Sequence, residues 1–154
     1  MELDPKTDLT FTRTLPVPRD VVWDCWTSPE HIPHFFVPRP HRVTGCEIDL
    51  QVGGRFNTVF EVDGREMRNT GVYLDIIEGR RLVFTDAFME GWKPAPEPFM
   101  TVMLDLSDAP EGGTVYTVTA RHRSEEARAT HEDMGFFAGW GTVADQLVEY
   151  AHTR

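Results

Sequence analysis

The segment HEDMGFFAGWGTVADQLVEY, residues 131–150, predicts the long helix around which the rest of the chain is arranged. Its apolar residues recur at helical spacing on one broad face, so we expect a helix over residues 131–152. The segment also contains Gly135, Gly139 and Gly141, although glycine in a helix costs up to about 1 kcal/mol relative to alanine. Gly139 and Gly141 fall near the two edges of the apolar face, beside Trp140. Small residues there either let strands pack close to the helix or leave volume for a ligand, and both interpretations stay open.

The stretch before this helix, from about residue 46 to residue 123, is rich in strand-forming residues. Runs of Val, Ile, Phe and Tyr are separated by turn signals at residues 53–54, 63–64 and 78–79. The pair Asp63-Gly64 between two alternating runs is typical of a β-hairpin. Successive strands joined by short turns predict an antiparallel sheet.

One more strand and two short helices are expected near the start of the chain. The alternation in LTFTRTL, residues 9–15, predicts a strand that ends at Pro16. Residues 18–28 have helical spacing, and prolines at positions 33 and 38 limit the next helical segment to one or two turns. The whole order predicts an α+β fold in which a curved antiparallel sheet of about six or seven strands surrounds the C-terminal helix.

Length, composition and charge fit one globular domain over residues 1–154, with a core at about 9–152. The net charge of −10 disfavours nucleic acid as a partner, because an acidic surface repels phosphates. The sequence shows neither a secretory signal nor an apolar stretch long enough to span a bilayer. We therefore expect a cytoplasmic protein without membrane insertion. In that compartment Cys25 and Cys46 should be free thiols. The protein is expected to be a monomer or a homodimer.

Neither a metal site nor a cofactor is expected. His31, His34 and His41 are the histidines closest together, but their spacing matches no known ligand pattern, and Pro33 interrupts any helix that would align them. The sequence also lacks HExxH, paired CxxC and GxSxG motifs. A solvated loop is the simpler interpretation of these histidines.

Three stretches resemble a known family when they are taken together in their order and spacing. They are VPRDVVWDCWTSPEHIPHFF, VGGRFNTVF…DGRE…TGVYLDIIEGRRLVFTDAF and HEDMGFFAGWGTVADQLVEY. Together they are similar to the SRPBCC, or START-like, superfamily, and within it to the branch of the activator of heat shock protein 90 ATPase. The resemblance implies a helix-grip fold, in which the sheet holds the C-terminal helix around an internal cavity.

Members of that superfamily bind lipids, polyketides, hormones or other apolar molecules, and some are cyclases. The leading hypothesis is therefore that this protein binds a small hydrophobic or amphipathic molecule in a cavity between the sheet and the C-terminal helix. An enzyme of the same fold, similar to a polyketide cyclase, dehydratase or hydrolase, is the first alternative, and a co-chaperone-like interaction module is the second. The expected cavity residues are Trp26, Phe36, Phe56, Phe60, Tyr73, Phe84, Asp86, Phe88, Trp92, Met100, Met103, His122, Phe137, Trp140 and Ala144.

Catalysis, if the protein is an enzyme, would need an ionisable pair inside the cavity. His122 lies at the end of an expected strand, and Asp86 and Glu61 are acids within expected strands. A histidine and a carboxylate in apolar surroundings can act as general base and acid. The alternative is that these side chains face solvent.

The segment AFMEGWKPAPEPFM, residues 87–100, interrupts the expected strands with three prolines and Trp92. It is either a solvated connection or a lid over one mouth of the cavity.

Overall fold

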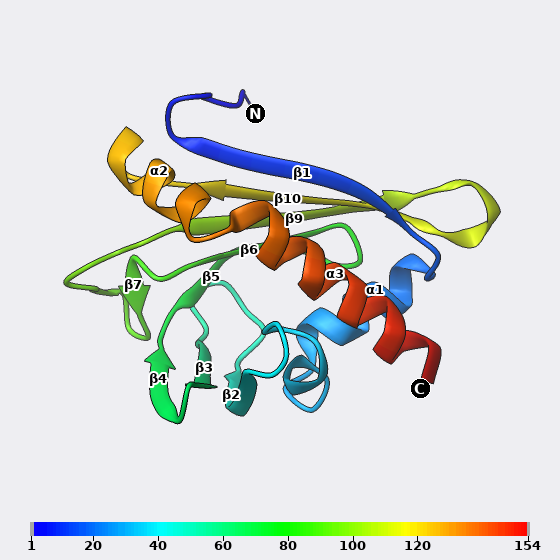
Figure 1. The fold of residues 1–154 in the computed structure, drawn as a ribbon, viewed down its shortest axis with the longest axis horizontal. Helices are drawn as coiled ribbons and strands as arrows, with labels where there is room; N and C mark the ends of the chain where they lie inside the picture. The colour runs from blue at the N-terminus through cyan, green and yellow to red at the C-terminus, as the bar shows by residue number, and fades with distance from the viewer. Residues whose placement is uncertain (1, 154) are drawn as a thin grey trace.

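Five antiparallel strands form the main sheet of the computed structural model, which describes residues 2–153 (Figure 1). The strands are joined in the order β1-β10-β9-β6-β5, so the first strand of the chain pairs with the last one. Their bounds are β1 Asp8–Leu15, β5 Val72–Ile77, β6 Arg81–Thr85, β9 Thr101–Asp108 and β10 Thr114–Arg121.

A smaller sheet, β2-β3-β4, continues from the β5 edge of the large one. β2 spans Arg42–Ile48, β3 Phe56–Val62 and β4 Arg65–Asn69. Two isolated bridges, Val52 to Tyr73 and Arg55 to Val72, join this part of the chain to β5. The expected hairpin turn at Asp63-Gly64 links β3 to β4, and both turn residues have positive φ, at 52° and 77°.

The predicted α+β class with antiparallel sheets is confirmed, but the strand count differs. The described residues contain ten strands, arranged as sheets of five, three and two. The two-stranded sheet is the hairpin of β7 (Phe88–Met89) and β8 (Lys93–Pro94), within the segment that the sequence marked as a possible lid. The number is higher in part because this hairpin adds two short strands.

Helices follow the first strand and end the chain. α1 spans Arg19–Thr27, and the 3₁₀ turn η1 spans Ile32–His34, as the prolines predict; a second 3₁₀ turn, η2 (Pro110–Gly112), joins β9 to β10. The predicted helix over 131–152 is instead two helices, α2 (Glu125–Asp133) and α3 (Phe136–Thr153). Gly135 separates them with a φ of +94°, a conformation that favours glycine and commonly ends a helix. Ser124 begins α2 by accepting a hydrogen bond from the Ala127 N–H at 3.1 Å.

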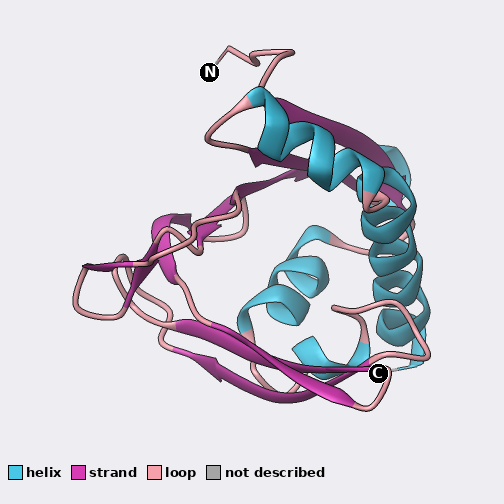
Figure 2. Ribbon diagram, turned by 60° about the vertical axis from the view of Figure 1, so that its left-hand side comes forward, coloured by secondary structure: helices cyan, strands magenta, loops and turns pink. Residues whose placement is uncertain are grey.

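The core lies where α1 and α3 pack against the large sheet. The strands curve around the helices in Figure 2. Trp26 of α1 is fully buried and stacks on Trp140 of α3, with ring centroids 6.2 Å apart. Alternate residues of the central strands, such as Leu104 of β9 and Val118 of β10, complete this core. α1 therefore fills the space between α3 and the large sheet, whereas none of the described helices fills the corresponding space beside β3 and β4, where a pocket lies instead.

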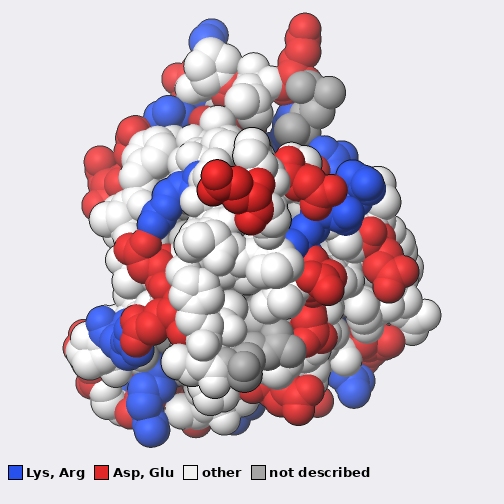
Figure 3. All heavy atoms as spheres, turned by 90° about the vertical axis from the view of Figure 1, so that its right-hand side faces the viewer, with Lys and Arg blue, Asp and Glu red and all other residues white. Residues whose placement is uncertain are grey.

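Acidic and basic side chains are interspersed over the surface that Figure 3 shows. Several form exposed ion pairs, among them Arg39–Glu149 at 3.0 Å and a pair between Arg13 of β1 and Asp145 of α3. Such pairs contribute little each, about 0–1 kcal/mol. Among the described residues, no helix is both long and apolar enough to cross a membrane.

Candidate ligand-binding pocket

A pocket of about 560 Å³ lies between the small sheet and the first half of α3. This volume is within the range of about 300–1,000 Å³ that is usual for small-molecule sites. The wall is formed by residues that come from the loop after η1, from β3 and β4, from the ends of β6 and β9, and from α2, α3 and their junction. They are Phe36, Val37, Pro38, Phe56, Thr58, Phe60, Met67, Asn69, Thr70, Gly71, Phe84, Thr85, Asp86, Phe99, Met100, His131, Met134, Gly135, Phe136, Gly139, Trp140 and Val143.

The middle of the pocket wall is aromatic. Phe36 contacts Phe56 and Phe60 of β3, at centroid distances of 5.7 and 5.8 Å, and Trp140 of α3 at 6.3 Å. Phe56 and Phe60 reach the same wall because residues an even number of positions apart on a strand share a face. Aromatic rings in offset and edge-on arrangements offer large, stiff apolar surfaces to a ligand.

Two glycines keep the α3 side of the pocket open. A Cβ atom at Gly139 would meet nothing within 4 Å, and the same holds at Gly135. Both residues line the pocket, so the helix backbone itself forms part of the wall. Gly141 differs, because its Cβ would lie 3.4 Å from Arg13 Nη1, which donates a hydrogen bond to the Gly141 carbonyl at 3.0 Å. The glycines near Trp140 therefore have different surroundings, and Gly139 is the one that leaves space for a ligand.

Asp86 is the single Asp or Glu that lines the pocket, and no Lys or Arg lines it among the described residues. Both oxygens of Asp86 accept hydrogen bonds from the Phe99 N–H, at 2.8 and 3.0 Å, and Oδ1 also accepts from the Met100 N–H at 3.0 Å. The carboxylate thereby closes the base of the β7–β8 hairpin. Its negative charge, without a nearby cation in the wall, makes the pocket unfavourable for anions.

A pair of buried histidines stands at the α2 end of the pocket. His131 Nδ1 lies 2.8 Å from His122 Nε2, and His122 Nδ1 lies 2.8 Å from the carbonyl oxygen of Thr7. His131 lines the pocket, and its ring packs between Phe99 and Phe136, at 4.8 and 5.1 Å. Burial and the neighbouring His122 lower the pKa of His131 from 6.5 to about 4, so the ring stays neutral near pH 7.

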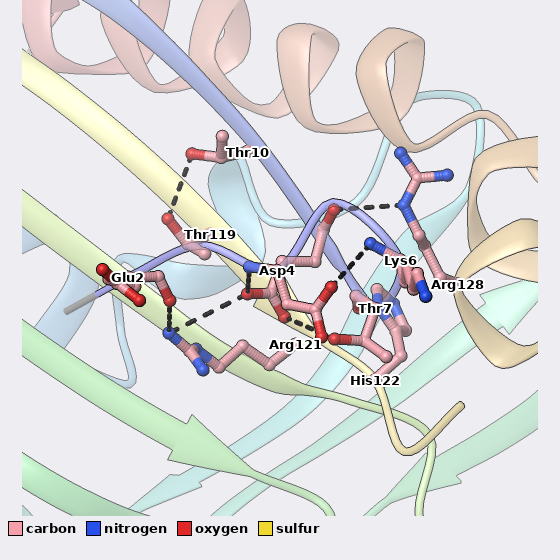
Figure 4. Close-up of polar contacts among 10 residues, drawn as sticks. Glu2, Asp4, Lys6, Thr7, Thr10, Thr119, Arg121, His122 and Arg128 are labelled. Atoms are coloured by element: carbon pink, nitrogen blue, oxygen red, sulfur yellow. Dashed lines mark hydrogen bonds and ion pairs between the residues drawn. The ribbon is translucent and has the colours of Figure 1, made fainter. Parts of the chain in front are cut away.

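The Thr7 carbonyl is held in place by contacts of the N-terminal segment. The backbone N–H of Asp4 donates to Asp8 Oδ2 at 2.8 Å, and Arg128 Nε of α2 donates to the Asp8 carbonyl at 3.1 Å. The backbone N–H of His122 also donates to the Thr7 carbonyl, at 3.0 Å. Figure 4 shows how these residues surround the start of β1. The chain before β1 thus fixes the position of His122, and through it the position of His131.

Seven of the cavity residues proposed from the sequence line this pocket, and eight lie elsewhere. Trp26, Tyr73 and Ala144 are fully buried behind the wall; Tyr73, for example, stacks on the far side of Phe56 at 5.5 Å. Phe137 is 49% exposed because it follows Phe136, which takes the inward position of α3. The residues that line the pocket are Phe36, Phe56, Phe60, Phe84, Asp86, Met100 and Trp140.

Four more of those residues, Phe88, Trp92, Met103 and His122, also lie outside the lining. Phe88 and Trp92 pack on each other in the β7–β8 hairpin at 5.8 Å, and Trp92 lies over Gly53. Met103 faces away from the core, because its neighbours Val102 and Leu104 take the inner face of β9. His122 stands behind His131.

The candidate catalytic residues are not brought together. Glu61 pairs with Arg42 at 3.2 Å on the outer face of the small sheet, away from the pocket. His122 uses both ring nitrogens in the contacts described above, and Asp86 accepts three backbone hydrogen bonds. Among the described residues, no group of three or more His, Cys, Asp or Glu side chains could hold a metal ion.

His131 is the ionisable pocket residue that sequence reasoning missed, and the polar residues Thr58, Asn69, Thr70 and Thr85 were missed with it. The expected continuous helix over 131–152 placed it at a helix end, without a partner. In the structure it belongs to α2, which brings it against His122 across the turn that precedes this helix. Phe99, Phe136 and Val143 were missed as lining residues too. The pattern carried one usable signal: His131 and Phe136 lie five residues apart on either side of a glycine that can break the helix.

The comparisons with known proteins agree with this architecture. The model of the family described as Activator of Hsp90 ATPase homolog 1-like protein matches residues 16–152. A solved structure from Nitrosomonas europaea is 38% identical, with a TM-score of 0.92 over 96% of this chain and 95% of that chain.

Two more distant structures share the fold. A Mycobacterium smegmatis protein is 24% identical with a TM-score of 0.79, over 94% of this chain and 90% of its own. An AHSA1-like protein from Aeromonas hydrophila is 20% identical with a TM-score of 0.69, over 94% and 93%. A search of the curated proteins finds no match. The resemblance read from the sequence is confirmed: the chain belongs to the Activator of Hsp90 ATPase homolog 1-like family.

Proposed function

We propose that this protein binds a neutral, mainly apolar small molecule in the pocket beside α3. The observation that carries the proposal is the lining of a 560 Å³ pocket by a cluster of aromatic rings, with a single carboxylate and no cationic side chain among the described residues. Known ligand sites have this character, an apolar wall with a few placed polar groups. The charge of Asp86 argues against carboxylate ligands such as fatty acids, because nothing in the wall neutralises a second negative charge.

Burial of apolar surface would supply most of the binding free energy. Each Å² of apolar surface that leaves water contributes about 25 cal/mol, from which the cost of immobilising the ligand is subtracted. Phe36 contacts both Phe60 and Trp140, at centroid distances of 5.8 and 6.3 Å, so little reorganisation of the wall is needed. Such a wall suits a rigid, flat aromatic ligand.

Ligand binding is favoured over catalysis by the positions of the ionisable groups. Glu61 is outside the pocket, and the oxygens of Asp86 are already used in backbone hydrogen bonds. The low pKa of His131, about 4, makes it a weak base near pH 7. Of these groups, His131 lines the pocket and is suited to orient a bound molecule.

Titration with N-phenyl-1-naphthylamine, a neutral dye that fluoresces in apolar surroundings, tests the proposal. Wild-type protein should bind the dye at micromolar concentration. Gly139→Leu should weaken binding by about tenfold or more, because its side chain enters the open space beside the wall. Gly139→Ala and Phe137→Ala are matched controls that change the same helix and should keep the affinity within about twofold.

The comparison of wild type with Gly139→Leu decides whether the ligand site lies beside Gly139. Equal dye binding by wild type and a folded Gly139→Leu variant would contradict a ligand site at this place. The absence of binding by the wild type to a panel of neutral two-ring compounds would contradict it as well.

A further inference from the structure

At the α2 end of the pocket, the His131 ring is a polar group, and its hydrogen-bond partners determine whether it donates or accepts. His131 lies there with its ring fixed between Phe99 and Phe136. Its Nδ1 is engaged with His122, which leaves Nε2 as the ring nitrogen with no hydrogen bond to the described residues. The polar groups beside it are already used: Asp86 accepts from two backbone N–H groups, and Thr85 Oγ1 lies 2.9 Å from Thr101 Oγ1.

The order of protons along the pair follows from its far end. A carbonyl oxygen only accepts hydrogen bonds, so the contact at 2.8 Å between Thr7 O and His122 requires a proton on His122 Nδ1. When His122 is neutral, its Nε2 has no proton and accepts. The contact at 2.8 Å to His131 then requires the proton on His131 Nδ1. Neutral His131 has one ring proton, so its Nε2 carries a lone pair.

We infer that His131 Nε2 is a fixed hydrogen-bond acceptor in the pocket and that the ligand carries a hydroxyl or N–H donor at this end of its apolar body. The inference rests on the proposed function of the pocket and names the class of ligand: a phenol, an aromatic alcohol or a similar neutral donor. His122 and Thr7 are positioning residues, since they select the tautomer of His131 without touching the ligand. Protonated carboxylic acids are excluded at neutral pH because they ionise, and the anion would lie in the pocket that Asp86 lines.

Nitrogen-15 NMR of the full chain with labelled histidine tests the tautomer directly, at pH 7.5 and without ligand. The chemical shift of an imidazole nitrogen separates protonated from unprotonated atoms. We expect His131 to be protonated at Nδ1 and unprotonated at Nε2, and His122 to be protonated at Nδ1. His131 with its proton at Nε2 would overturn the inference whether or not any ligand is found.

Binding of two isosteric probes, 2-naphthol and 2-methylnaphthalene, tests the choice of ligand. They differ by a hydroxyl in place of a methyl group. Replacing His131 by Phe should lower the ratio of 2-naphthol affinity to 2-methylnaphthalene affinity by about fivefold, the factor for one hydrogen bond of about 1 kcal/mol. His122→Phe should lower the same ratio by a smaller factor, because His131 is then free to present either tautomer. A mere packing defect would weaken both probes alike and leave the ratio unchanged.

The outcomes separate the two proposals. If neither probe binds the wild type, the pocket function fails. If both bind and the ratio is the same in wild type and in His131→Phe, the pocket stands and the acceptor is refuted. If His131→Phe does not fold, His131→Leu takes its place, and the NMR result on the wild type decides the tautomer independently.

Discussion

The two sheets have the same alternation of residues, but in the large sheet it builds the core and in the small sheet it builds a pocket wall. In the large sheet, Leu104 and Val118 lie on the face that packs against α1 and α3, and their side chains are almost completely excluded from solvent. In the small sheet, Phe56, Thr58 and Phe60 also share one face, but that face borders the pocket. Beside the large sheet, the space is filled by α1, and above all by its buried residue Trp26. Alternation therefore predicts which residues share a face, and only the presence or absence of a covering helix decides between core and cavity.

The Trp140 ring lies at the boundary of these two regions. One side of it stacks on Trp26, in the core, and it also contacts Phe36 of the pocket wall. Loss of a side chain on the core side removes contacts that nothing else replaces. Loss of one on the pocket side enlarges a space that is already there. Stability and ligand binding should therefore respond differently to substitutions on the two sides.

The largest expected effect is that of Trp26→Ala. This fully buried ring contacts Phe35, Phe84 and Trp140, so its loss should lower the free energy of unfolding by about 4 kcal/mol. Phe60→Ala, on the half-buried pocket side, should cost about 1.5 kcal/mol or less. Urea denaturation of the two variants measures both values. Equal losses would contradict the division into a filled and an unfilled side.

A second, smaller effect concerns the dependence of stability on pH. The pKa of His131 is lowered to about 4 by burial and by His122, whereas in the unfolded chain it returns to about 6.5. Between these two pH values the unfolded state binds a proton that the native state does not bind. The free energy of unfolding should therefore fall as the pH drops from 6.5 to 4, by at most about 1.4 kcal/mol per pH unit from this residue, and this contribution should become constant below pH 4.

The matched variants for this effect are His131→Gln and His41→Gln. Carboxylates titrate in the same range in all three proteins, so the readout is the difference between the variants and the wild type. His131→Gln should have a flatter curve of unfolding free energy between pH 6.5 and 4, and His41→Gln should follow the wild type. Parallel curves for His131→Gln and the wild type would show that the buried histidine pair does not contribute.

The fold was predictable because its signals are local. The hairpin turn predicted at Asp63-Gly64 requires positive φ at both residues, and both have it in the structure. Pro33 allows only a short turn, and η1 is three residues long. The family resemblance added the helix-grip arrangement and the position of a cavity beside the last helix.

The candidate site was predictable only in part, because it depends on where one helix stops and the next begins. A continuous helix from residue 131 gives both Phe136 and Phe137 a place on the broad apolar face. In α3, Phe136 takes the buried position and Phe137, one residue further along the helix, faces solvent, so the buried stripe is narrower than the sequence pattern indicates. The pairing of His131 with His122 joins two separate elements, and no spacing in the sequence encodes it.

The smallest expected effect distinguishes the glycines of that break from one another. Gly139 has helical backbone and open space at its missing Cβ, so Gly139→Ala should raise the free energy of unfolding by up to about 1 kcal/mol through helix propensity alone. Gly135 also has open space, but its φ of +94° is unfavourable for any residue with a Cβ atom. Gly135→Ala should therefore lower the free energy of unfolding, by about 1 kcal/mol or more.

Thermal and urea denaturation of the two alanine variants should give changes of opposite sign. The space around each Cβ is the same, so a difference in sign isolates the backbone conformation as its cause. Two stabilised variants would mean that residues 125–153 can form one continuous helix. His131 would then be carried away from His122, and both the pocket and its acceptor would have to be placed anew.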